Sequence, residues 1–138
     1  MHPNSPPGSV FRTADDYERL LDGLDPAIVG FTPDVGHLAA GGMDPLAVIE
    51  RHRNRVDHVH LKDIDGAGAW APTGAGQIDF PSIVAHLRDT GYTGWVVFED
   101  ESPDAERDPD ESVRRNGAYA REVLAPGLKS PAAVRGGA

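Results

Sequence analysis

The chain has 138 residues and a mass of 14.7 kDa, with 39% hydrophobic and 25% charged residues, the composition of a one-domain globular protein and not of a disordered or fibrous chain. It contains no cysteine, which excludes disulfide scaffolds, thiolate metal sites and cysteine nucleophiles. Its 22 acidic and 13 basic residues give a formal net charge of −9, which argues against nucleic acids and anionic membranes as partners.

Neither a secretion signal nor a membrane span is visible in the sequence. Met1–Gly8 is polar and proline-rich, with no apolar core. Nowhere does the chain contain an apolar run of about 18 residues. We therefore expect a cytoplasmic protein.

Short apolar runs alternate with helix-periodic stretches, an order typical of parallel strands joined by helices. A stub of an earlier strand is expected near Met1. The predicted strands that follow are Ala27–Phe31, Val56–Leu61 and Trp95–Glu99.

Each predicted helix opens with its own capping signal and carries an apolar face. A helix stop is expected at Gly91. The stretch 125–138 lacks periodicity, so we predict a domain over residues 1–124 and a disordered tail over 125–138. The helix starts are Thr13 with Asp16, Asp44-Pro45, Asp79 before Pro81, and Asp108-Pro109 with Glu111. The apolar faces of the second, third and fourth helices are, in turn, Leu46, Val48 and Ile49; Ile83, Val84 and Leu87; and Val113, Ala120 and Leu124.

The spacing of these units predicts the fold. A complete (β/α)8 barrel needs about 250 residues, or roughly 31 per strand-helix unit. This chain holds about four such units. The sequence therefore predicts an α/β fold that is half of a TIM barrel and is incomplete as a single chain.

Three ionisable residues, Asp34, His60 and Glu99, follow the three predicted strands at or near their carboxyl ends. Because strand side chains alternate between faces, all three can point to one axial spot, where barrel enzymes keep their active sites. Two carboxylates and an imidazole suit Mn²⁺, Co²⁺, Mg²⁺ or Zn²⁺. The alternative is structural: a turn aspartate, a core histidine and the first residue of an acidic loop.

His37 and Lys62 would flank this metal position and could bind substrate hydroxyls or a developing oxyanion. We predict a catalytic role for Lys62, and substrate contacts for His37, Lys62 and Glu101. The alternatives are a surface histidine and a solvated loop lysine.

The other features carry less chemistry. His58 is predicted to lie one layer below His60 in a structural role, and His52 and His86 to be exposed on helices. The stretch 65–76 is rich in glycine but lacks the phosphate-loop and dinucleotide-binding spacings, so it is either a flap over the site or a surface loop.

Two runs, PDVGHLAAGGMDPLAVIERHRNRVDHVHLKD and GAGQIDFPSIVAHLRDTGYTGWVVFEDE, resemble the xylose isomerase-like TIM barrel superfamily of sugar phosphate isomerases and epimerases, and most closely its inosose dehydratase-like members. The similarity extends from about His2 to Leu124. Its motifs are D-x-G-H, H-x-H-x-K-D, and G-Y-x-G-W followed by an apolar run into glutamate.

The resemblance implies that the chain is the C-terminal half of the barrel. It implies a divalent metal held by a glutamate, an aspartate, a histidine and a second glutamate, of which Asp34, His60 and Glu99 are the last three. The first glutamate is missing with the first four units, and Met1–Asn4 match only the end of the fifth strand. His37 corresponds to a histidine that contacts substrate.

The chemistry that the resemblance implies is metal-assisted proton abstraction next to a carbonyl of a sugar or cyclitol, with a catalytic role for Glu99 as a carboxylate that shuttles the proton. Isomerases and epimerases then return the proton, and inosose dehydratases expel a hydroxyl. A non-catalytic fragment is an alternative, and a metal-dependent endonuclease is disfavoured by the acidic charge. A half barrel exposes strand edges, so we expect a homodimer or the missing N-terminal half to complete it.

Overall fold

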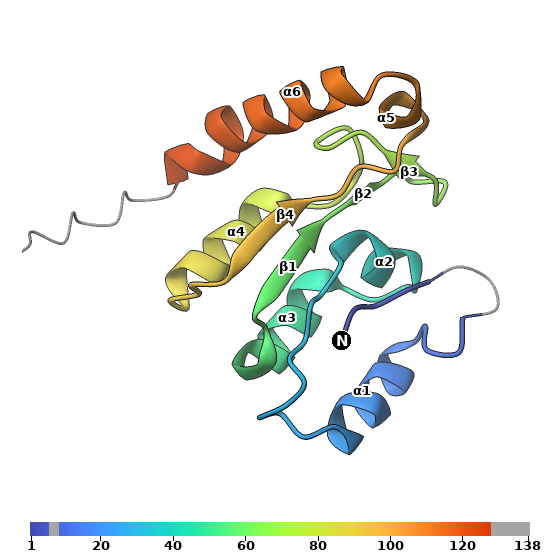
Figure 1. The fold of residues 1–138 in the computed structure, drawn as a ribbon, viewed down its shortest axis with the longest axis vertical. Helices are drawn as coiled ribbons and strands as arrows, with labels where there is room; N and C mark the ends of the chain where they lie inside the picture. Colours follow the sequence, from blue (N-terminus) through green and yellow to red (C-terminus); the bar gives the residue numbers. More distant parts are fainter. Residues whose placement is uncertain (6–8, 128–138) are drawn as a thin grey trace, which may run out of the picture.

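The computed structural model describes residues 1–5 and 9–127, in which a small parallel sheet is covered by helices (Figure 1). The strands are β1 (His58–Leu61), β2 (Asp63–Ile64), β3 (Trp70–Ala71) and β4 (Trp95–Phe98). The helices are α1 (Ala14–Gly23), α2 (Val35–Ala40), α3 (Pro45–His52), η1 (Arg53–Arg55), α4 (Phe80–Asp89), α5 (Pro103–Arg107) and α6 (Pro109–Tyr119), which continues as η2 (Ala120–Leu124) and η3 (Ala125–Gly127).

The sheet has the strand order of a barrel. β1 pairs in parallel with β4, in a register that places His58 opposite Trp95. Along the other edge of β1 runs the segment 31–34, through parallel bridges from Phe31 to Val56 and from Asp34 to His60. Met1 lies outside that segment, where its carbonyl accepts the Thr32 N–H at 2.7 Å. Chain order therefore equals spatial order, as in consecutive barrel strands.

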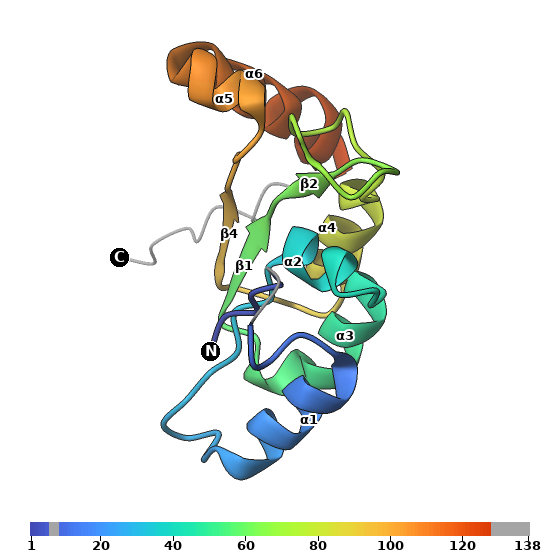
Figure 2. The ribbon, with the colours of Figure 1, turned by 90° about the vertical axis from the view of Figure 1, so that its right-hand side faces the viewer.

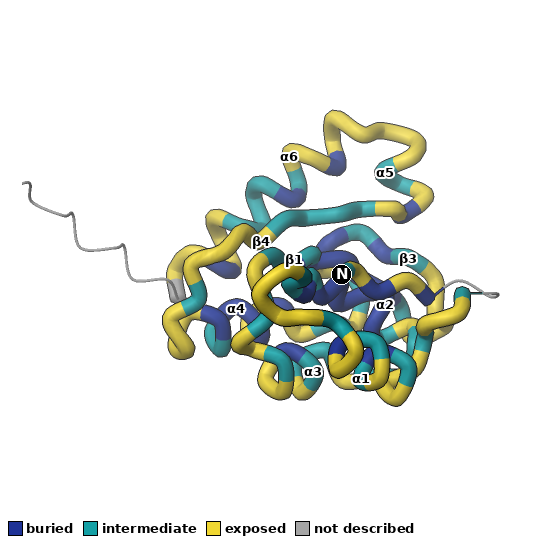
Figure 3. Tube along the Cα trace, turned by 60° about the horizontal axis from the view of Figure 1, so that its bottom comes forward, coloured by how far each residue is buried: buried dark blue, intermediate teal, exposed yellow. Residues whose placement is uncertain are grey.

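The helices α1 to α4 lie on one side of these strands and leave the other side bare (Figure 2). The core sits between β1 and the helices α2, α3 and α4, where apolar side chains from each element interlock. Buried residues gather around β1 and α2, whereas much of α6 is exposed (Figure 3). The core residues are Val35, Ile49, Val59, Leu61, Phe80, Ile83, Val84, Leu87 and Leu124.

All four predicted helix starts are confirmed. Thr13 forms a capping box with Asp16 at the start of α1. Asp44, Asp79 and Asp108 each accept a backbone N–H at the first turn of α3, α4 and α6. The predicted stop is also confirmed, since Gly91 lies just past α4 with φ +75°.

The predicted strand over Ala27–Phe31 is wrong. Asp25 begins a turn in which its carbonyl accepts the N–H groups of Ile28 and Val29, at 3.0 and 2.9 Å. Ile28 is consequently 80% exposed. Only Phe31 and Asp34 bridge to neighbouring residues, so the apolar run Ala27–Phe31 mostly forms a turn that leads into the sheet.

Other differences concern short elements and one helix face. The sequence analysis did not predict α2, α5 or the β2–β3 hairpin, since helices of six or five residues and two-residue strands leave almost no periodic pattern. Val113, expected on the apolar face of α6, is 71% exposed. Ala125–Gly127 form a short helical turn, and the rest of the predicted tail lies outside the described residues.

The barrel is not closed. Among the described residues, β4 has β1 as its one strand neighbour, so its other edge is free. Trp95 and Val96 on this strand are 75% and 36% exposed. Within the described part of the chain, no helix combines the length and hydropathy that crossing a membrane would require.

Asp100 attaches α5 and α6 to the end of β4. Its carboxylate accepts hydrogen bonds from the Ser102 N–H at 3.0 Å and from the Ser112 hydroxyl at 2.6 Å. Burial alone would raise the pKa of Asp100, but these hydrogen bonds outweigh it and hold the pKa below its usual value.

We expect Asp100→Asn to lower the free energy of unfolding by about 1–3 kcal/mol, because buried hydroxyl and amide donors lose a charged acceptor. This stabilisation is complete above the unfolded-state pKa of about 3.9 and is lost as the pH falls through the lower folded-state pKa. Urea unfolding at pH 7 and pH 3 measures both effects. Glu106→Gln, on the exposed side of α5, is the control; equal stability of the two variants at pH 7 would contradict this assignment.

Candidate metal centre

Four potential ligands converge at the carboxyl ends of the strands. They are His2, Asp34, His60 and Glu99, and each offers one atom that lies within 4.8 Å of the other three. The shortest contact joins His60 Nδ1 and Glu99 Oε2 at 2.6 Å. The structure thus brings together the three residues selected from the sequence and adds His2; their role as ligands stays a prediction.

Local backbone structure positions each of these groups. Asp34 is the N-cap of α2, where its Oδ1 accepts the His37 N–H at 2.9 Å. His60 lies on β1, next to Asp34 in the ladder. Glu99 directly follows β4, and its N–H donates to the Leu61 carbonyl at 3.0 Å, so the backbone pairing extends to the site.

The buried carboxylate of Asp34 tests whether a cation fits here. Its Oδ2 is fully buried and accepts no hydrogen bond from the described residues. The nearest polar atoms are His2 Nε2 at 3.5 Å, Lys62 Nζ at 3.6 Å and His60 Nδ1 at 3.8 Å. A buried carboxylate oxygen without a donor is costly, and a divalent cation bound by two imidazoles and two carboxylates would satisfy it.

His2 is the functional candidate that the sequence analysis missed. Its Nε2 lies 3.1 Å from His60 Nδ1 and 3.5 Å from Asp34 Oδ2, so it is the fourth member of the candidate ligand group. The available signal was spacing: Asp34 minus His2 is 34 − 2 = 32 residues, close to the roughly 31 residues of one barrel unit. One spacing between two residues is weak evidence by itself, and the few residues around His2 show no strand pattern that would support it.

Lys62 is 1% exposed and sits among carboxylates. Its Nζ donates to Glu99 Oε1 at 2.8 Å and lies 3.1 Å from Glu101 Oε2. Burial alone would lower the pKa of Lys62, but these carboxylates and Asp34 outweigh it and raise the pKa, so the side chain stays an ammonium. Three carboxylates against one ammonium leave an excess of negative charge, which favours a divalent cation.

His37 lies on α2 with its ring between Ser5 and Lys62. Its Nδ1 is 3.0 Å from the Ser5 hydroxyl, and its Nε2 is 3.2 Å from Lys62 Nζ. Burial and the neighbouring ammonium lower the pKa of His37, so the ring is neutral at pH 7. The close approach of α2 requires Gly36, where a Cβ would lie 2.8 Å from Lys62 Cγ.

A cavity of about 650 Å³ opens beside these groups. Glu99, Glu101 and Trp70 of the β2–β3 hairpin contribute to its lining. The Trp70 ring lies 5.0 Å from the His37 ring and 5.1 Å from Lys62 Nζ, which places a cation–π contact in the wall. Part of the 65–76 stretch therefore reaches the site, as the flap alternative requires.

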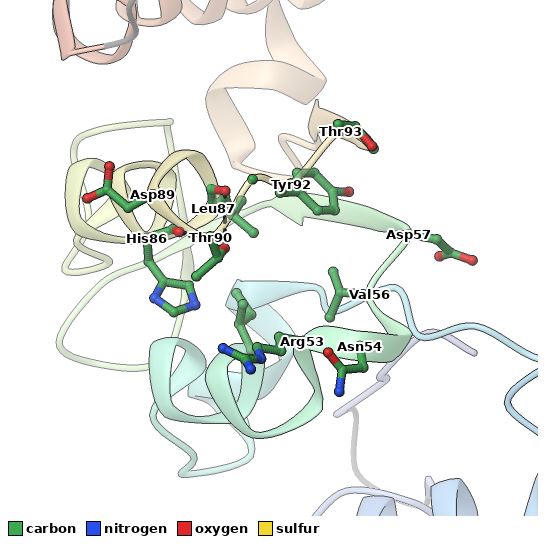
Figure 4. Close-up of a pocket in the computed structure, with 13 residues that line it drawn as sticks. Arg53, Asn54, Val56, Asp57, His86, Leu87, Asp89, Thr90, Tyr92 and Thr93 are labelled. Atoms are coloured by element: carbon green, nitrogen blue, oxygen red, sulfur yellow. Dashed lines mark hydrogen bonds between the residues drawn. The ribbon is translucent and has the colours of Figure 1, made fainter.

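A second groove, of about 710 Å³, lies at the opposite ends of the strands (Figure 4). Arg53, Asn54, Asp57, His86 and Tyr92 contribute to its lining. Burial and the Asp57 charge raise the pKa of Tyr92 to about 12. Among the described residues the one group that could ligate a metal lies elsewhere, and barrel active sites form at the carboxyl ends of strands, so the candidate site is not this groove.

The predicted exposure of the two helix histidines is wrong. The side chain of His86 is only 19% exposed beside Glu50. His52 is half-buried, with its ring 5.7 Å from that of Phe31. His86 of α4 faces α3, which it contacts on the same side of the sheet, whereas His52 of α3 faces the segment 31–34.

Comparison with known proteins identifies relatives over most of the chain. An inosose dehydratase from Geobacillus thermodenitrificans is 34% identical, and the match covers 84% of this chain and 45% of that protein. The rhizopine catabolism protein MocC of Rhizobium meliloti is 35% identical over 76% of this chain and 36% of its own. A sugar phosphate isomerase/epimerase from Parabacteroides distasonis, of known structure, is 30% identical, with a TM-score of 0.65 over 83% of this chain and 37% of that chain.

The structure of the IolI protein with a bound zinc atom has a TM-score of 0.70 over 94% of this chain and 48% of that chain; at 17% identity this is a likeness of fold. The chain thus spans about half the length of the relatives it matches. The family model of the xylose isomerase-like TIM barrel matches residues 1–123. With the strand order and the partial barrel described above, this match shows that the chain belongs to the xylose isomerase-like TIM barrel family.

Proposed function

We propose that His2, Asp34, His60 and Glu99 hold a divalent cation, Mn²⁺, Co²⁺, Mg²⁺ or Zn²⁺. The observation that carries this proposal is the buried Asp34 Oδ2, which faces two imidazole nitrogens and has no hydrogen-bond donor among the described residues. The IolI structure, which is similar in fold, holds a zinc atom, and this supports a divalent cation as the occupant.

We propose further that the site removes a proton from the carbon next to a carbonyl group of a sugar or cyclitol. When bound, the cation supplies Lewis acidity that polarises substrate oxygens. Although burial would raise the pKa of Glu99, Lys62 outweighs it and lowers that pKa, so Glu99 is a carboxylate that can accept the proton.

Lys62 and His37 complete the reaction scheme. The Lys62 ammonium cannot act as a base, but it can donate a hydrogen bond to the substrate oxygen on which negative charge develops. The neutral His37 ring, fixed by Ser5 and Lys62, and the Glu101 carboxylate at the cavity wall can bind substrate hydroxyls. Return of the proton to carbon gives isomerisation or epimerisation, in keeping with the relative from Parabacteroides distasonis.

A second candidate is dehydration of an inosose, which the inosose dehydratase relatives at 30–34% identity favour. Both reactions begin with the same proton abstraction. They differ in the next step, in which a dehydratase expels a hydroxyl from the neighbouring carbon. Release of water therefore separates the two.

We expect His60→Ala and His2→Ala each to weaken Mn²⁺ binding by more than about 10-fold, because each removes one of four ligands. Isothermal titration calorimetry and metal content by mass spectrometry measure the effect. The control is His86→Ala, which removes a histidine at the other end of the strands. Unchanged metal content in His60→Ala would show that the ligand assignment is wrong.

We expect Lys62→Gln to slow proton exchange between substrate and heavy water by about 100-fold while metal binding persists, because loss of one hydrogen-bond donor to a developing oxyanion costs about this much. Exchange is followed by NMR with a ketose and with an inosose, and formation of a dehydrated product is followed in parallel. Arg51→Gln, which removes an exposed cation of α3, should exchange normally. A metal-loaded protein without any exchange would instead be a non-catalytic metal-binding module.

We propose that the free edge of β4 is paired by the strands of a second copy or of the other half of the barrel. Exposed Trp95 and Val96 beside an unpaired strand edge favour such pairing. Sedimentation equilibrium should give about twice the 14.7 kDa chain mass if the partner is a second copy. A monomer would exclude the second copy.

A further inference from the structure

The residue after Lys62 holds together the loop that bears Trp70. Asp63 is 2% exposed, and its carboxylate accepts four backbone N–H groups. Oδ1 accepts those of Ile64 and Ile78 at 3.0 and 3.2 Å. Oδ2 accepts those of Gly74 and Gly76 at 2.9 and 3.0 Å. One side chain thus joins both ends of the loop that runs from β2 to the start of α4.

The loop packs directly on this carboxylate. At Gly76 a Cβ would lie 2.2 Å from Asp63 Oδ1, so any side chain there would push the loop away. Gly74 has φ +79°, a conformation suited to glycine, and a Cβ on it would lie 2.4 Å from the Tyr119 ring of α6. The loop is therefore fitted between Asp63 and α6.

The same residue is linked to the wall of the cavity. Asp63 pairs with Ala71 and Ile64 with Trp70 in the two-residue ladder of β2 and β3. Trp70 in turn contacts the Lys62 ammonium and the His37 ring. A shift of the loop away from Asp63 would carry Trp70 away from both of these groups.

We propose that Asp63 is a positioning residue that fixes the Trp70 wall of the substrate cavity by binding the loop backbone. The assignment of this cavity to substrate rests on the proposed function above. Asp63 itself touches neither the candidate ligands nor substrate; it acts through the hairpin. Both carboxylate oxygens are needed as acceptors, because each receives two donors.

Asparagine tests this requirement with almost no change in shape. Whichever way its amide is oriented, the NH₂ group faces two N–H donors, so two hydrogen bonds are lost and like dipoles meet. Gly76→Ala perturbs the same contact from the loop side. Two controls match these changes: Asp79→Asn removes a carboxylate that caps α4, and Gly66→Ala adds a methyl group where nothing lies within 4 Å.

The experiment uses Trp70 as the reporter in a Trp95→Phe background. We expect Asp63→Asn and Gly76→Ala to shift Trp70 emission to longer wavelength and to raise acrylamide quenching at least twofold, with far-UV circular dichroism retained. Asp79→Asn and Gly66→Ala should leave both signals unchanged. Folded Asp63→Asn with wild-type emission and quenching would overturn the proposal.

If both variants fail to fold, hydrogen exchange of the parent protein tests whether Asp63 binds the loop backbone. Amides of Gly74, Gly76 and Ile78 are expected to be protected as one group, and exchange at the rate of unstructured peptide would overturn the proposal. These readouts need neither metal nor substrate, so loss of the proposed catalytic function would leave them unaffected. With substrate, Asp63→Asn should raise KM several-fold while Mn²⁺ affinity stays at the parent value.

Discussion

The carboxylate of Asp34 is the constraint on which the rest of the site depends. It is completely buried, yet only one of its oxygens has a hydrogen-bond donor among the described residues, the His37 N–H in the first turn of α2. The same contact fixes the cap of the helix and directs the second oxygen toward His2, His60 and Lys62. The Asp34 side chain thus both caps α2 and contributes to the candidate metal centre.

Charge balance gives the site its second constraint. Lys62 is buried against Glu99, Glu101 and Asp34, and a buried ammonium is stable only with such partners. One ammonium does not neutralise three carboxylates, and the ring nitrogens nearest Asp34 belong to the side chain that most often ligates metals. A divalent cation would restore the balance, and it would leave Lys62 free to act on substrate oxygens.

Much of this arrangement could be predicted from the sequence because its signals are local or periodic. Aspartate-proline pairs marked the starts of α3 and α6, and the position of Asp34, His60 and Glu99 at the carboxyl ends of neighbouring barrel segments predicted that these three residues come together. The predicted strand over Ala27–Phe31 is wrong because a short apolar run can also form a turn, here the one in which the Asp25 carbonyl accepts the N–H groups of Ile28 and Val29. The packing of Lys62 also depends on contacts between distant residues, which no single window of sequence contains.

The loop that bears Trp70 also depends on contacts that a local stretch of sequence does not reveal. Its glycines excluded known phosphate-binding loops but did not reveal that Gly76 must approach Asp63, because that contact forms only when both ends of the loop meet. His2 was equally hidden, since a residue beside the chain start carries no strand pattern. Half of a barrel thus retains the converging strand ends that bring the candidate ligands together, while the outer edge of β4 remains free among the described residues.

The most direct test of the central claim is anomalous diffraction from crystals grown with Mn²⁺, recorded on both sides of the manganese absorption edge. We expect one strong peak at bonding distance, about 2.0–2.3 Å, from Asp34 Oδ2 and from the side chains of His2, His60 and Glu99. A fully occupied ion elsewhere, with Asp34 Oδ2 bonded instead to Lys62, would contradict that claim.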